Sequence, residues 1–184
     1  MPLQSPEERF HDNIVDLTTF LKEIIERCHN LGYTNIDPKV VEMVRGFLRG
    51  YHAEEIIKTF SIKSYEHWPS IKKHDEIFFK NHCNDVFSDL PKEYVDSFRK
   101  LFETYKDTGD PVITEEEKNI IWLYFESFVK ISIHYIHENR RPDWDLSNNT
   151  MRKVYRIGFL PELKGLQKQV KIWNVKLKWP ERTI

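Results

Sequence analysis

The chain has 184 residues, of which 40% are hydrophobic and 14% aromatic, a composition that excludes a disordered protein and favours a single domain. Its six glycines are too few for an α/β enzyme with several glycine-rich nucleotide loops. The net charge of −1 hides an asymmetry, because residues 1–139 hold 17 Lys and Arg against 25 Asp and Glu, whereas residues 140–184 hold 11 against 4.

The cysteines and the N-terminal residues indicate a cellular compartment. Cys28 and Cys83 are not at the spacing of a metal or redox motif, and both fall in segments with helical periodicity. We therefore expect reduced, partly buried thiols, as in an intracellular protein. The first ten residues, MPLQSPEERF, lack the basic and apolar regions of a signal peptide, so we expect a protein that is not secreted.

The first predicted element is a long amphipathic helix. Ser5, Pro6 and Glu8 have the spacing of a capping box with proline in the first turn. From Phe10 to Leu31 the apolar residues alternate at spacings of four and three, and Gly32 then ends the pattern. The pattern favours packing within the chain's own bundle over a coiled coil with another chain.

Four further helices are predicted before residue 106. The first begins at Asp37-Pro38 and ends near Gly50, and the second begins at about Ala53 and is interrupted before Trp68-Pro69. The third spans about residues 69–87, and the fourth runs from about residue 91 to residue 105.

The least polar stretch is IIWLYFESFVKISIHYIHENRR, residues 120–141. Thr114 and Glu117 form a second capping box before it. A membrane span is excluded, because Glu126 and Lys130 in its middle would each cost at least ~2.5 kcal/mol in a bilayer. The pattern instead predicts an all-α, multi-helix bundle around a largely apolar central helix at about 115–139, within a helical domain of residues 1–140.

Residues 141–184 form a basic, tryptophan-containing C-terminal extension. Near its end, apolar residues alternate with polar ones over VKIWNVKLKW, residues 170–179, which is typical of a strand. The sequence thus predicts one β-strand at the end of an otherwise helical chain.

Catalytic motifs are absent. The chain contains no GxSxG turn, no glycine-flanked cysteine and no phosphate-binding loop, so we expect no enzyme, no catalytic residues and no cofactor. His134 and His137 have a spacing that can hold a metal, with His74, His82 or Cys83 as a third ligand. Because eight histidines are scattered along the chain, we interpret the pair as part of a solvated polar stripe and predict no metal site.

The basic extension is the predicted partner-binding segment. Its apolar anchors would be Trp173, Val175, Leu177 and Trp179, and its steering cations Lys171, Lys176 and Lys178. Two alternatives stay open. The same cations and aromatic rings could bind nucleic acid, or the extension could fold back over the acidic body of its own chain.

Three segments carry a resemblance to a group of viral proteins: SYEHWPSIKKHDEIFF (64–79), VFSDLP (86–91) and IIWLYFESFVKISIHYIHENRRP (120–142). They resemble segments of uncharacterised helical proteins of nucleocytoplasmic large DNA viruses, over about residues 64–142. The resemblance implies a viral protein of the host cytoplasm or the virion, with a minor structural role such as a minor capsid or assembly component. The combined hypothesis is a non-enzymatic interaction or structural protein whose basic C-terminal segment docks to another protein.

Overall fold

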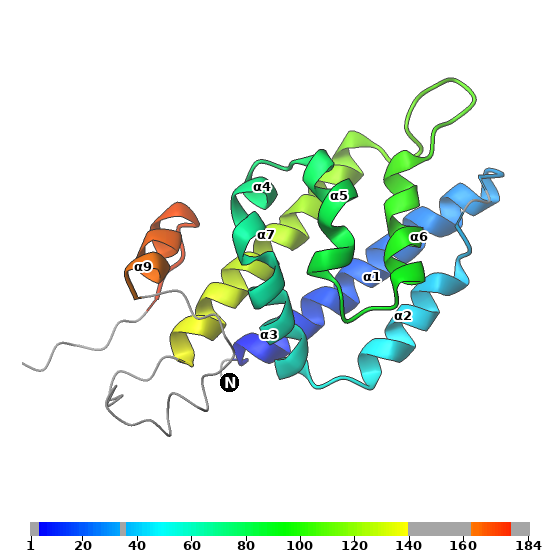
Figure 1. The fold of residues 1–184 in the computed structure, drawn as a ribbon. Helices are drawn as coiled ribbons and strands as arrows, with labels where there is room; N and C mark the ends of the chain where they lie inside the picture. Colours follow the sequence, from blue (N-terminus) through cyan, green and yellow to red (C-terminus); the bar gives the residue numbers. More distant parts are fainter. Residues whose placement is uncertain (1–3, 34–35, 140–162, 178–184) are drawn as a thin grey trace, which may run out of the picture.

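The computed structural model describes residues 4–33, 36–139 and 163–177, and its regular structure there is helical (Figure 1). The predicted all-α fold is confirmed, since the described residues contain no strand and only one isolated bridge, between Tyr105 and Pro111. The elements are α1 (Pro6–Asn30), α2 (Lys39–Arg49), α3 (Ala53–Ser64), the 3₁₀ turn η1 (Tyr65–His67), α4 (Trp68–Lys72), α5 (Glu76–Val86), α6 (Lys92–Glu103), α7 (Glu115–Glu138) and α9 (Leu163–Ile172).

Helices α1 and α7 form the centre of the bundle. In Figure 1 they run side by side, and α7 also contacts α3, α4 and α9. The side chains of Phe125 and Phe128 are 4% and 1% exposed, which confirms that the apolar helix is buried. Among the described residues, no helix is long and apolar enough to cross a membrane.

Both predicted capping boxes are present. At α1, the Ser5 hydroxyl accepts the N–H of Glu8 at 3.2 Å and the Glu8 carboxylate accepts the N–H of Ser5 at 3.0 Å. Thr114 and Glu117 do the same at α7, at 3.1 and 2.9 Å. These exchanges satisfy N–H groups that a helix start leaves without partners, which is why both long helices begin where the sequence indicates.

The single helix predicted over residues 69–87 is wrong, because the chain forms two helices there. His74 has a positive φ of 55°, which ends α4, and the Asp75 carboxylate then accepts the N–H groups of Ile77 and Phe78 at 3.0 and 3.2 Å. A left-handed residue followed by an aspartate N-cap stops one helix and starts the next. The break allows α4 to contact α7 while α5 packs against α6.

Two groups of ion pairs connect the start of α7 to its neighbours. Arg27, near the end of α1, pairs with Glu117 and donates from Nη2 to the carbonyl of Val112 at 3.1 Å. Lys118 is buried, and its Nζ lies 2.9 Å from Glu76 at the start of α5 and 3.1 Å from Glu115. The first turn of α7 is thereby tied to both α1 and α5.

The predicted C-terminal strand is also wrong over residues 170–177; residues 178 and 179 lie outside the described residues. Residues up to Ile172 belong to α9, and a turn follows in which Asn174 has a φ of 51°. Leu166, Val170 and Trp173 are spaced by four and three, and this helical period places them against the body of the protein. The described part of the extension therefore packs on the helical domain.

Candidate functional site

An apolar pocket of ≈110 Å³ lies between the α2–α3 pair and the α5–α6 pair. Side chains of α1 and α7 form its floor, and all six of these helices contribute to its lining. Almost all of the lining groups are aliphatic or aromatic. Such a lining suits the pocket to holding an apolar group.

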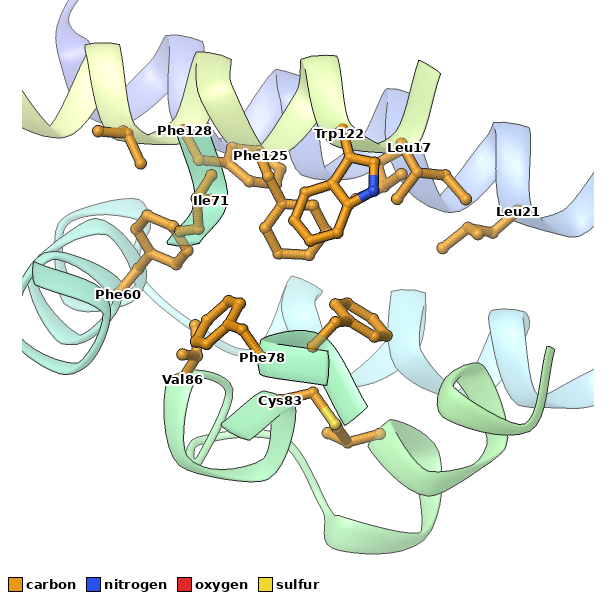
Figure 2. Close-up of a cluster of buried hydrophobic side chains, with 14 of the residues drawn as sticks. Leu17, Leu21, Phe60, Ile71, Phe78, Cys83, Val86, Trp122, Phe125 and Phe128 are labelled. Carbon is orange, nitrogen blue, oxygen red and sulfur yellow. The ribbon is translucent and has the colours of Figure 1, made fainter. Parts of the chain in front are cut away.

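The floor is a set of contacting phenylalanine rings. Phe10 from α1 and Phe128 from α7 have ring centroids 4.8 Å apart, and Phe60 from α3 lies 5.7 Å from Phe128. Phe125 completes the group at 6.1 Å from Phe128. Figure 2 shows Phe60, Phe125 and Phe128 converging on one interior space, with Cys83 and Val86 on the α5 side. Rings at these distances stabilise one another, so we expect a well-ordered floor.

The mouth is bordered by apolar side chains that are only partly covered. On one side Phe47 and Tyr51 have ring centroids 4.8 Å apart, and on the other side Leu90 and Phe98 are half-buried. Partly exposed aromatic residues around an apolar pocket lose unfavourable contact with water when an apolar group covers them. The mouth therefore favours association with an apolar surface.

Contacts between helices limit the extent of the pocket. Helix α2 contacts α6, and α3 contacts α5, and side chains of all four helices line the pocket together with those of α1 and α7. Its volume is comparable with that of an engineered apolar cavity of ~150 Å³ that admits benzene. The space thus fits one ring or one branched aliphatic group, and a whole helix cannot enter it.

Polar groups in the lining are few. Asp89, in the connection between α5 and α6, is the charged residue among those that line the pocket. The thiol of Cys83 is buried, and desolvation raises its pKa above the ordinary value despite the nearby charge of Arg99. The thiol is therefore protonated at neutral pH and a weak nucleophile. This lining suits binding by apolar contact.

The structure places the predicted partner-binding residues differently from the sequence-based hypothesis. Trp173, predicted as an external anchor, is instead 2% exposed in the chain's own core, with Lys72 Nζ 4.7 Å from its ring centroid. Val175 and Leu177 are partly buried against the same core. Lys171 and Lys176 are exposed, whereas Lys178 and Trp179 lie outside the described residues. For residues 163–177 the extension folds back onto its own body.

The histidines do not gather into a metal site. His74 stacks on Trp122, with centroids 5.4 Å apart, and its Nε2 lies 2.7 Å from a carboxylate oxygen of Glu126. Burial, with contributions from Arg9 and His137, lowers the pKa of His134. Across the described parts of the chain, no group of three or more His, Cys, Asp or Glu side chains could hold a metal ion.

Reasoning from the sequence did not predict the pocket. The available signal was the twelve phenylalanines of the chain, several of which fall in the short helices α2, α3, α5 and α6. Periodicity shows which face of each helix is apolar, but whether facing stripes close or leave a space depends on how the helices cross.

Comparison with known proteins does not assign the chain to a family. No protein-family model, no curated protein and no solved structure matches it. The geometry of the pocket is therefore the basis for a functional proposal.

Proposed function

We propose that this chain is a non-enzymatic interaction protein that holds an apolar side chain of a partner protein in the pocket between α2–α3 and α5–α6. The observation that carries the proposal is the combination of a closed phenylalanine floor with a mouth of half-exposed aromatic residues. Interfaces commonly obtain most of their binding energy from a few aromatic or aliphatic anchors buried in such pockets. The functional class agrees with the sequence-based prediction, but the proposed binding surface is different.

The size of the pocket limits the binding free energy that one inserted side chain can contribute. Burying one Leu, Ile or Phe side chain contributes about 1.5–3 kcal/mol. This amount is smaller than the cost of association, so the partner must also cover the rim around Phe47 and Phe98. We therefore expect a partner with an apolar stripe, in which one residue enters the pocket and its neighbours cover the mouth.

Two other sequence-based predictions are affected differently. For nucleic-acid binding, the ring of Trp173 is not available for a base to stack on, because it is buried. Lys171 and Lys176 are exposed. A role in the assembly of a large DNA virus depends on the sequence resemblance and stays a prediction.

Two substitutions in α2 test the proposal. Phe47→Glu places a carboxylate at the mouth, where an apolar partner would have to desolvate it, whereas Met43→Glu changes an exposed residue one turn away that does not line the pocket. We expect Phe47→Glu to abolish recovery of the partner from the natural source of the protein and Met43→Glu to leave it unchanged. Circular dichroism of both variants checks that the fold is intact.

Alkylation of Cys83 provides a second, independent readout. In a Cys28→Ser background, Cys83 is the remaining thiol, and it lines the pocket whereas Cys28 does not. We expect the bound partner to slow the reaction of Cys83 with N-ethylmaleimide, and to have no effect in the Phe47→Glu variant. A partner that binds both α2 variants equally and leaves Cys83 equally reactive would contradict the proposal.

A further inference from the structure

We infer that the partner segment is an amphipathic helix that lies across the mouth, inserts one aliphatic or aromatic side chain into the pocket, and places a Lys or Arg beside Asp89. This inference rests on the proposed function and specifies the chemistry of the partner. It depends on two observations, the charge of Asp89, which pairs with no described residue, and the arrangement of apolar groups around the mouth.

Asp89 places an acidic side chain at the pocket. It lies in the connection from α5 to α6, is exposed, and has no hydrogen bond or ion pair with any residue that the structure describes. It does not cap α6, whose N-cap is Pro91 with no side-chain bond. A partner cation can therefore pair with Asp89 without displacing an interaction with any residue that the structure describes, whereas a partner carboxylate would be repelled.

The rim determines the shape of the segment. Half-exposed apolar side chains border the mouth on both sides, with Phe47 and Tyr51 opposite Leu90 and Phe98, so a single inserted residue would leave most of them uncovered. A helix presents apolar residues at i, i+3, i+4 and i+7, which covers both sides of a central anchor. Strand addition would need a free sheet edge, and the described ranges contain no sheet.

A displayed library of helical peptides tests the inference on the full-length chain. Peptides of about 20 residues are long enough to form a helix on contact, and the positions of one face are randomised. After selection on the wild-type protein and counter-selection on Phe47→Glu, we expect enrichment of a large apolar residue with a Lys or Arg within one helical turn of it.

Matched carboxylate variants then test the role of Asp89. For the strongest selected peptide, we expect Asp89→Asn to raise the Kd by up to about fivefold and added salt to remove this difference. Glu93→Gln removes an exposed carboxylate four residues away, outside the pocket, and we expect the Kd to be unchanged. Replacing the basic residue of the peptide with Gln should reproduce the effect of Asp89→Asn.

The possible outcomes separate the inference from the proposed function. If binders lose affinity with Phe47→Glu but show no preference for Lys or Arg, the pocket binds a partner and the inference about Asp89 is wrong. If the binders stay non-helical by circular dichroism when bound, the inference that the partner segment is a helix is wrong. If no peptide depends on Phe47 and only a small hydrocarbon such as hexane slows alkylation of Cys83, the proposed function itself fails.

Discussion

Two buried serines show how one hydrogen bond changes the energetic role of the same side chain. Ser64 and Ser132 are both fully buried. The Ser64 hydroxyl accepts a hydrogen bond from the indole N–H of Trp68 at 2.9 Å, whereas the Ser132 hydroxyl has no partner among the described residues. A buried hydroxyl without a partner has lost its bonds to water without compensation.

Substituting each serine with alanine should have opposite effects. We expect Ser64→Ala to lower the free energy of unfolding by about 1–3 kcal/mol, because it leaves the buried indole N–H of Trp68 without an acceptor. We expect Ser132→Ala to leave this free energy unchanged or raise it by up to about 1 kcal/mol. Urea unfolding at equilibrium measures both. A loss of more than about 1 kcal/mol in Ser132→Ala would mean that its hydroxyl has a partner.

The Arg27–Glu117 pair makes stability depend on pH. Burial alone would raise the pKa of Glu117, but hydrogen bonds from Arg27 and from the N–H of Thr114 together outweigh it. The pKa therefore lies below the ordinary value of 4.5, so folding favours the ionised carboxylate. The contribution of this carboxylate to the free energy of unfolding is complete above its pKa in the unfolded chain. It is lost as the pH falls through the lower pKa of the folded chain.

A Glu117→Gln variant should reveal this contribution. At neutral pH we expect it to unfold about 1 kcal/mol more easily than the wild type, a modest loss because Arg27 is exposed. Below a pH of about 4.5 the difference should shrink, because the wild-type carboxyl also becomes neutral. Glu116→Gln, at the exposed neighbouring position, is the control and should be indistinguishable from the wild type at every pH. A difference that stays constant with pH would contradict the assignment.

At the scale of elements, α9 shows how two periodicities compete in one segment. Over residues 170–179 apolar and polar residues alternate, but a spacing of four and three links Leu166, Val170 and Trp173. The helical set buries Leu166 and Trp173 in the core, and it prevails in the structure. No neighbouring strand is present in the described residues to satisfy the backbone of a lone strand, whereas a helix satisfies its own.

The position of α9 predicts a large effect of one tryptophan. We expect Trp173→Ala to lower the free energy of unfolding by about 3–5 kcal/mol, the usual range for truncating a buried aromatic side chain. Ile172, at the preceding position, is 42% exposed, so we expect Ile172→Ala to change the free energy of unfolding by less than about 1 kcal/mol. Thermal unfolding of both variants shows whether α9 contributes to the core or lies outside it. If the Trp173 variant is as stable as the Ile172 variant, α9 does not contribute to the core.

The same scale shows which elements could be predicted and why. The starts of α1 and α7 follow from local chemistry, because a capping box needs only residues three positions apart. The break between α4 and α5 could not be predicted from apolar spacing, since it depends on a left-handed backbone at His74 that residue type does not require. Local signals therefore located the helix starts better than the interruption.

At the scale of the whole molecule, a buried central helix was predictable and the apolar pocket was not. Too few positions of α7 are polar for it to lie on the surface, so the sequence alone required that its neighbours cover Phe125 and Phe128. The pocket, in contrast, is a property of how six helices meet, and no single segment encodes it. The burial of Trp173 could not be predicted for the same reason, because residues distant in sequence cover it.

The pocket also has a mechanical consequence for the folded chain. The pocket is an apolar space that no described side chain fills. Its volume is eliminated when the chain unfolds and water contacts every group, so unfolding lowers the total volume. Compression thus shifts the equilibrium away from the folded form, and an anchor seated among the phenylalanines would remove that penalty. The partner we propose would therefore make the protein less compressible as well as more stable.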